Sequence, residues 1–222
     1  RGLEWLDATC PLVSKVHREA EAHHEAGRLC LLIGHAGHPE VIGTMGQLPN
    51  GAVLLVENVA AAESLVPGSA DLAYLTQTTL SVDDAAEIIA VLERRFPAIQ
   101  APTKEDICYA TTNRQRAVRQ AAERADVCLV VGAPNSSNSL RLVEMARRHG
   151  CPRAELLESA ADLDWALLDG AATVALSAGA SAPEHLVEEL LAVLSQRFEV
   201  SVELVEAARE DVRFKLPLAL TA

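Results

Sequence analysis

The fold is decided by two stretches of sequence, "LCLLIG" at residues 29–34 and "VCLVVG" at residues 127–132. Both are short apolar runs without alternating polar residues, a pattern typical of parallel strands that are buried on both faces. Gly34 follows Cys10 at the same spacing at which Gly132 follows Cys108. We therefore expect the two runs to be equivalent strands in two copies of one lobe.

The similarity between the two halves continues beyond these strands. "AVLLVENVAAAESL" (52–65) corresponds to "AELLESAADLDWAL" (154–167), and "LAYLTQTTLSVDDAAEIIAVL" (72–92) corresponds to "TVALSAGASAPEHLVEELLAVL" (173–194). Each copy reads as a cysteine turn, a helix, and then three short strands that are each followed by a helical stretch. The helix of the first copy should end at Gly27, a typical C′ glycine. Right-handed βαβ crossovers then predict an α/β chain of two duplicated three-layer αβα lobes with parallel sheets.

Two prolines and several polar residues in "FPAIQAPTKED" place the boundary between the lobes near residue 103. We expect the lobes to cover residues 11–103 and 104–196. Residues 1–10 should be the end of a preceding lobe, and residues 197–222 a C-terminal tail. Because the chain begins with Arg rather than Met, we expect it to be a fragment of a longer protein.

Composition excludes several classes of protein. The net charge of -12 argues against a nucleic-acid partner, which needs a basic surface. No apolar run is long enough to span a bilayer, and we expect a cytoplasmic location. The five cysteines do not have the spacing of a secreted disulfide framework. Cys30 and Cys128 lie inside the strand runs and should be buried, while Cys151 precedes a proline in a loop and could be inert.

Polar residues gather where the predicted strands end, which is where open parallel sheets bind ligands. In "GHAGHPEVIGTMGQ", residues 34–47, His35, His38 and Glu40 follow the first strand. They could be metal ligands or a proton relay, since a carboxylic acid beside an imidazole can pass a proton. For His35 an ordinary polar loop is the favoured interpretation, and for His38 with Glu40 a functional role is favoured.

The second copy has a different set of polar residues at the equivalent place. In "VVGAPNSSNSLRLVEMA", residues 130–146, Ser136, Ser137, Asn138 and Ser139 precede a helix. Free N–H groups at a helix start, with hydroxyl and amide donors around them, can bind a phosphate. The simpler alternative is N-capping, which needs only one such residue.

A third set follows the last strand of each copy. Thr78 and Thr79 in "TQTTLSVDD" could donate hydrogen bonds to a small ligand. Ser81 and Ser181, each three residues before an acidic residue, look like capping boxes, which would explain both serines without any ligand.

Cys10 and Cys108 stand at equivalent points, each in a turn ahead of a helix, where the helix start stabilises a thiolate. We expect the two sulfurs to share a metal. Two thiolates complete neither a zinc site nor an iron–sulfur cluster, so a ligand is missing. A zinc hydrolase that uses these cysteines with His38 is one alternative, and a non-catalytic phosphate-binding module of two lobes is another.

Six motifs together resemble the LytB/IspH family of 4-hydroxy-3-methylbut-2-enyl diphosphate reductases. They occur in order along nearly the whole chain: "DATCPLVSKVH", "GHAGHPEVIGTMGQ", "TQTTLSVDD", "DICYATTNRQ", "NSSNSLRL" and "AGASAPE". The resemblance implies an oxidoreductase of the non-mevalonate isoprenoid pathway. Such enzymes convert their allylic diphosphate to isopentenyl and dimethylallyl diphosphate by reductive dehydroxylation, with ferredoxin or flavodoxin as electron donor. The family has three αβα lobes around a 4Fe-4S cluster that three cysteines bind.

At the reacting end of the substrate, the resemblance implies Cys10 and Cys108 as cluster ligands, Glu40 as the proton donor, His38 as a substrate contact, and Thr78 as a hydrogen-bond partner that relays protons. The family's first lobe, with its own cysteine and two histidines, has no counterpart in this chain.

At the other end of the substrate, the resemblance implies that Ser136, Ser137, Asn138 and Ser181 bind the diphosphate. Neutral donors and a helix start can do so without an arginine clamp. We expect Ser136, Asn138 and Ser181 to come from the two different lobe copies, so that the diphosphate bridges them.

Overall fold

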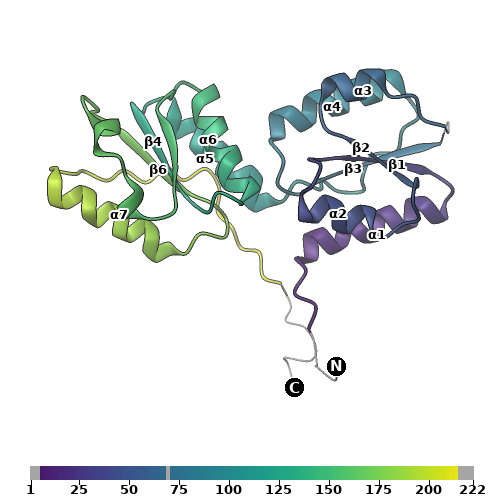
Figure 1. Ribbon diagram of the computed structural model, residues 1–222, viewed down its shortest axis with the longest axis horizontal. Helices are drawn as coiled ribbons and strands as arrows, with labels where there is room; N and C mark the ends of the chain where they lie inside the picture. Colours follow the sequence, from purple (N-terminus) through teal and green to yellow (C-terminus); the bar gives the residue numbers. More distant parts are fainter. Residues whose placement is uncertain (1–5, 69–70, 215–222) are drawn as a thin grey trace. The chain divides into compact units, whose positions relative to one another are not determined.

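The computed structural model describes residues 6–68 and 71–214, which form two compact units. The first unit takes the described residues up to Thr78, residues 83–106 and residues 209–214, and the second takes residues 79–82 and 107–208. Each unit contains one three-stranded parallel sheet (Figure 1). The predicted α/β class with two duplicated parallel-sheet lobes is therefore confirmed. The exact domain boundaries stay a prediction.

The first sheet has the strand order β2-β1-β3. In chain order its elements are α1 (Pro11–Glu25), β1 (Leu29–Ile33), α2 (Pro39–Met45), β2 (Val53–Val56), α3 (Val59–Ser64), β3 (Leu72–Thr76) and α4 (Val82–Arg95).

Helix α1 begins and ends where the local sequence predicts. Pro11 occupies its first turn, where a missing N–H costs nothing. Gly27 has a φ of 79°, and the Arg28 N–H donates to the His23 carbonyl at 2.9 Å, which closes the helix as expected of a C′ glycine.

Helices cover both faces of this sheet. Val16 of α1 and Val41 of α2 pack with Cys30 and Leu32 on one face. Helices α3 and α4 lie against the other face (Figure 1). Because successive side chains of a strand point to opposite faces, every residue from Cys30 to Ile33 is buried. Both faces being covered explains the unbroken apolar run.

The second sheet repeats this topology with the order β5-β4-β6. Its elements are α5 (Tyr109–Ala122), β4 (Val127–Val131), α6 (Ser137–Arg148), β5 (Ala154–Leu157), the 3₁₀ helices η1 (Ala160–Asp162) and η2 (Trp165–Leu168), β6 (Val174–Ala178) and α7 (Glu184–Arg197).

The copies differ after the edge strand, where α3 of the first unit is replaced by η1 and η2. Asp162 and Ser159 form a capping box that closes a single turn. Asp164 then accepts the Ala166 N–H at 3.0 Å and begins a second turn. Two caps placed this close to each other leave no room for a continuous helix.

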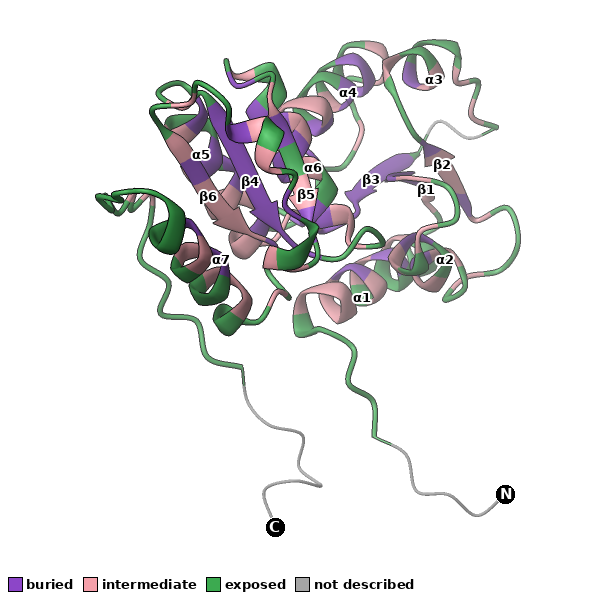
Figure 2. Cartoon of the chain, turned by 60° about the vertical axis from the view of Figure 1, so that its left-hand side comes forward, coloured by how far each residue is buried: buried purple, intermediate pink, exposed green. Residues whose placement is uncertain are grey.

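The core of the second unit also has two halves, one on each face of the sheet. Cys128 and Val130 of β4 pack with residues of α5 and α6, and Val127, Leu129 and Val131 pack with residues of α7 and the 3₁₀ segment. Figure 2 shows β4 as a buried strand between helices whose outer faces are exposed. Among the described residues, no helix is long and apolar enough to cross a membrane.

Candidate active site

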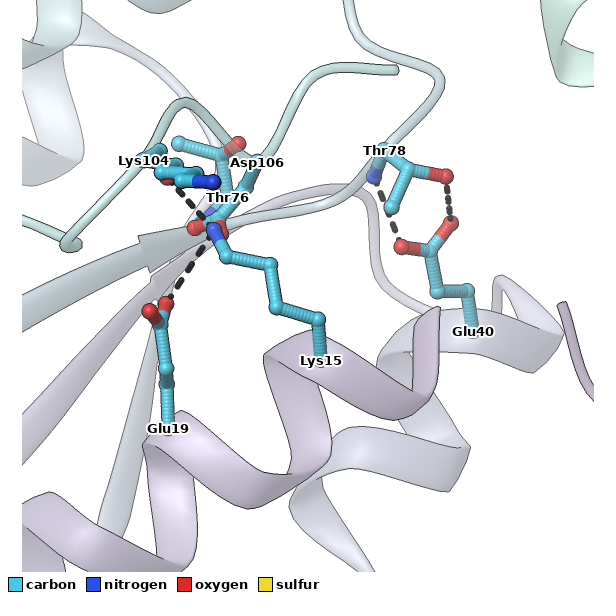
Figure 3. Close-up of polar contacts among 7 residues, drawn as sticks. All are labelled: Lys15, Glu19, Glu40, Thr76, Thr78, Lys104 and Asp106. Carbon is cyan, nitrogen blue, oxygen red and sulfur yellow. Dashed lines mark hydrogen bonds and ion pairs between the residues drawn. The ribbon is translucent and has the colours of Figure 1, made fainter. Parts of the chain in front are cut away.

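Glu40 and Thr78 meet at the carboxyl end of the first sheet. Helix α2 begins just after β1, and its N-cap residue His38 accepts the Glu40 N–H through Nδ1 at 3.2 Å. The Glu40 carboxylate reaches across to the end of β3, where Oε1 accepts the Thr78 N–H at 2.7 Å and Oε2 accepts the Thr78 hydroxyl at 3.1 Å (Figure 3). The structure thus brings together the residues predicted to donate and to relay the proton.

The surroundings of this pair raise the pKa of the Glu40 carboxyl group. Burial is the largest influence and raises the pKa of Glu40; the hydrogen bonds from Thr78 oppose the rise and the Asp106 carboxylate adds to it. The pKa of Glu40 therefore lies above its ordinary value. Burial lowers the pKa of His38, and neighbouring His35 contributes in the same direction, so His38 favours the neutral imidazole. With Nδ1 accepting a hydrogen bond, the neutral ring carries its proton on Nε2 and presents a donor there.

Asp106, which no sequence pattern marks as a site residue, supports the same end of the sheet. Its side chain is 0% exposed, and Oδ1 lies 2.7 Å from the Lys15 ammonium. Its Oδ2 accepts the Thr76 N–H at 2.9 Å, and Lys15 also donates to the Lys104 carbonyl (Figure 3). Burial raises the pKa of Asp106, although the ion pair with Lys15 opposes that rise. Nothing local in the sequence signals this pair, because Lys15 and Asp106 are far apart along the chain.

His35 has a backbone role in the described structure. Its N–H donates to Oε1 of Gln77, a side chain that is 1% exposed, at 3.1 Å. Within the part of the chain that the structure describes, no three His, Cys, Asp or Glu side chains form a group that could hold a metal ion.

In the second unit, the start of α6 contains a buried side chain without a partner. Asn138 is 5% exposed, and in the described residues neither its Oδ1 nor its Nδ2 has a hydrogen-bond partner. A buried polar group left unpaired costs about 1–3 kcal/mol, which a ligand could recover. The N-cap of the helix is Ser136, whose Oγ accepts the Ser139 N–H at 3.3 Å. Capping therefore explains one of these residues and leaves Asn138 unexplained.

Ser181 does not cap a helix. Helix α7 begins at Glu184, and its N-cap is Pro183, so the predicted capping box of Ser181 with Glu184 is wrong. Pro183 disfavours the helical conformation of the residue before it, Ala182. The helix therefore begins after Pro183. The exposed Ser181 lies in the turn after β6, and its hydroxyl is not needed for a cap.

The expectation that the diphosphate residues come from both lobe copies is also wrong. Ser136, Ser137, Asn138 and Ser181 all belong to the second unit. They follow β4 and β6, which pair directly, so the carboxyl ends of two neighbouring strands position all four.

Because of the duplication, these side chains occupy equivalent helix positions in the two units. His38 and Glu40 occupy the N-cap and second position of α2, and Ser136 and Asn138 occupy the N-cap and second position of α6. The first copy thus carries an acid and an imidazole where the second carries a hydroxyl and an amide. The same pair of helix positions therefore presents an acid and an imidazole in one unit, and a hydroxyl and an amide suited to an anion in the other.

The cysteines fall into two groups by environment. Cys10 and Cys108 are the N-cap residues of α1 and α5, and Cys108 Sγ accepts the Thr111 N–H at 3.3 Å. Burial raises the pKa of Cys30 to about 11 and that of Cys128 to about 12, and it also raises the pKa of Cys151. The thiols of these last three cysteines are therefore protonated, whereas Cys10 in the first unit and Cys108 in the second each lie at a helix start. Two thiolates alone do not complete an iron–sulfur site.

Comparisons with known proteins agree with this geometry. The family model described as "LytB protein" matches residues 1–195. The 4-hydroxy-3-methylbut-2-enyl diphosphate reductase of Ruegeria pomeroyi is 61% identical over 221 residues, which cover 99% of this chain and 70% of the relative. The protein of the same name from Phenylobacterium zucineum is 60% identical with the same coverage. The chain therefore spans about 70% of the length of these relatives.

Solved structures give the same result. The E-1-hydroxy-2-methyl-but-2-enyl-4-diphosphate reductase from Plasmodium falciparum superposes with a TM-score of 0.91 at 37% identity, covering 97% of this chain and 68% of that one. A second structure, (E)-4-hydroxy-3-methyl-but-2-enyl diphosphate reductase, has a TM-score of 0.53 at 30% identity. The resemblance noted from six motifs is thereby confirmed, and the chain belongs to the LytB family of 4-hydroxy-3-methylbut-2-enyl diphosphate reductases, which are oxidoreductases.

Proposed function

We propose that this chain supplies the proton donor, the diphosphate site and two cluster thiolates for the reductive dehydroxylation of 4-hydroxy-3-methylbut-2-enyl diphosphate. The products are isopentenyl and dimethylallyl diphosphate. The observation that carries the proposal is the half-buried Glu40 carboxyl group, held by both the N–H and the hydroxyl of Thr78 at the carboxyl end of β3. A carboxyl group with a raised pKa beside a hydroxyl is suited to general acid catalysis.

The proton chemistry follows from this pair. The reaction breaks the allylic C–O bond, so the leaving hydroxyl needs one proton to depart as water, and the carbon skeleton takes up two electrons and one further proton. Glu40 donates a proton to the leaving oxygen, and the Thr78 hydroxyl relays it; the contact of that hydroxyl with Glu40 Oε2 supports this role. His38, with its proton on Nε2, donates a hydrogen bond to the substrate beside them.

The diphosphate binds at the start of α6. Ser136, Ser137 and Asn138 come from that start, and Ser181 comes from the neighbouring turn after β6. The unpartnered Asn138 amide gains a phosphate oxygen as its partner, and the helix start adds N–H donors and a favourable dipole. The donors that these residues supply are neutral hydroxyl, amide and N–H groups.

Cys10 and Cys108 would bind a 4Fe-4S cluster, as the family resemblance implies, together with a third thiolate from outside this set. When bound, the cluster supplies the two electrons and a Lewis acid. Ferredoxin or flavodoxin is the electron donor that we propose. The N-cap positions of both cysteines support this assignment, because each sulfur lies at a helix start and in a unit of the same topology.

The experiment uses the chain reconstituted with iron and sulfide without oxygen, together with the part of the Ruegeria pomeroyi reductase that the match leaves uncovered. Glu40→Gln should keep iron, sulfide and substrate binding while turnover with a chemical reductant falls about 10²–10⁴-fold. Glu87→Gln, an exposed glutamate on α4, is the matched control and should turn over normally. Near-normal turnover of Glu40→Gln contradicts the assignment of the proton donor.

Asn138→Ala tests the diphosphate site in the same preparation. Because the amide touches a part of the substrate that does not react, its loss should raise the Michaelis constant more than it lowers the turnover number. An unchanged Michaelis constant with a collapsed turnover number contradicts the site.

One alternative is a phosphate-binding module of two lobes without an intact cluster. The observation that favours it is that the described residues hold no group of three metal-ligating side chains. After the same reconstitution, a brown protein with stoichiometric iron and sulfide favours the reductase. A colourless protein that still binds pyrophosphate favours the module.

A further inference from the structure

Ser139, the third residue of α6, is packed between two glycines. It is 0% exposed. A Cβ atom on Gly132, after β4, would lie 2.2 Å from its Oγ, and a Cβ on Gly179, after β6, would lie 2.1 Å from it. Both distances are far below any van der Waals contact, so a Ser139 hydroxyl in this place requires glycine at both positions.

The Ser139 hydroxyl directs the Ser136 hydroxyl. Ser139 Oγ donates to Ser136 Oγ at 3.0 Å, and the Ser139 N–H donates to the same oxygen at 3.3 Å. A hydroxyl oxygen has two lone pairs and one proton. Because Ser139 occupies both lone pairs of Ser136 Oγ, the only further hydrogen bond that this hydroxyl can form is one that its own O–H donates. A hydroxyl that accepts hydrogen bonds is also polarised into a stronger donor.

The first unit is an internal control for the packing role of this position. Val41 of α2 follows Gly34 at the spacing at which Ser139 follows Gly132. Val41 is 2% exposed, and its Cγ2 lies 2.7 Å from the place of a Cβ on Gly34. An apolar side chain therefore fills this site in the same topology. Packing alone does not call for a hydroxyl at Ser139, whose burial is costly unless it is hydrogen-bonded.

We propose that Ser139 is a positioning residue: its hydrogen bonds to Ser136 Oγ orient the Ser136 hydroxyl so that its O–H donates to a diphosphate oxygen. The inference rests on the proposed function, in which Ser136 belongs to the diphosphate site. Ser139 itself does not touch the ligand. It acts through the Ser136 oxygen, and Gly132 and Gly179 provide the space that it needs.

The test is a double-mutant cycle on the binding of inorganic pyrophosphate to the 222-residue chain, measured by isothermal titration calorimetry. Ser136→Ala removes a hydrogen bond to a charged group and should weaken binding about 10- to 100-fold. Ser139→Ala keeps the N–H that caps the helix and should weaken binding about 2- to 10-fold. If Ser139 acts through Ser136, adding Ser139→Ala to Ser136→Ala should cause no further loss.

Ser195→Ala is the matched control, because this hydroxyl donates only to the Leu191 carbonyl of its own helix α7. It should bind pyrophosphate like the unchanged chain, and circular dichroism should show all variants folded. If Ser136→Ala weakens binding and Ser139→Ala does not, the inference is overturned and the diphosphate site stands. If Ser139→Ala weakens binding equally with and without Ser136, its role is structural and the inference is overturned. If Ser136→Ala has no effect, the diphosphate site itself is wrong.

Discussion

Gly179→Ala should destabilise the second unit, and Ser139→Ala should relieve most of that effect. The added Cβ would lie 2.1 Å from Ser139 Oγ, which is the only severe contact among its three nearest atoms; the next are Ser139 Cβ at 3.3 Å and Asn138 Nδ2 at 3.8 Å. Overpacking of this kind costs about 1–3 kcal/mol. The backbone adds no penalty, since Gly179 is not among the glycines with positive φ.

Removing the Ser139 hydroxyl leaves a Cβ–Cβ separation of 3.3 Å, which is tight but can be relieved by a small shift. Ser139→Ala alone should cost about 0.5–1.5 kcal/mol for the lost hydrogen bond. Adding Gly179→Ala to Ser139→Ala should then lower the free energy of unfolding by no more than a few tenths of a kcal/mol, because alanine at position 179 also restricts the unfolded chain. The coupling between the two sites should therefore be about 1–3 kcal/mol.

Gly132→Ala is the matched comparison. Its Cβ would meet Ser139 Oγ at 2.2 Å and also Ser139 Cβ at 2.7 Å, so removing the hydroxyl leaves a clash. Urea unfolding followed by circular dichroism measures each free energy of unfolding, and thermal melts should show shifts of about 4–8 °C per kcal/mol for a unit of this size. Equal destabilisation by Gly179→Ala with and without the Ser139 hydroxyl, or equal rescue of both glycine variants, refutes the packing argument.

Three further predictions concern charge and sulfur. Because folding raises the pKa of Glu40, the folded state binds the proton of Glu40 more tightly than the unfolded state does, and the free energy of unfolding should fall as pH rises from about 4.5 through the raised pKa. Urea titrations at a series of pH values should show that Glu40→Gln flattens this slope. An unchanged slope contradicts the raised pKa. Lys15→Met leaves the fully buried Asp106 carboxylate without its cation and should cost about 3 kcal/mol in urea unfolding, with Asp106→Asn restoring part of it. Arg124→Met, which breaks an exposed pair with Glu203, is the control and should change the free energy of unfolding far less. In the reconstituted preparation, Cys10→Ser and Cys108→Ser should each abolish the cluster, while Cys30→Ser, Cys128→Ser and Cys151→Ser should leave iron and sulfide per chain intact; loss of cluster in the Cys151 variant would mean that the wrong ligands are named.

The sequence by itself determined the features that depend on local pattern. The apolar runs around Cys30 and Cys128 predicted buried parallel strands, because a strand covered on both faces needs no polar alternation. The common spacing from each cysteine to its glycine predicted the duplication, and Gly27 predicted the end of α1. Six motifs in order were enough to indicate the family. These signals are short, and each can be read within one or two elements.

Tertiary structure decided the contacts that join distant segments. Strand register brings Thr78 to Glu40, and the path of residues 104–106 brings Asp106 beside Lys15, a pair with no local signal. Helix α7 begins after Pro183 and not at the predicted Ser181 cap, because the proline disfavours a helical conformation for the residue before it. The wedging of Ser139 between Gly132 and Gly179 depends on the pairing of β4 with β6. A sequence pattern reports the preference of a residue for its neighbours along the chain, whereas the parallel sheet fixes which strand ends face each other across it.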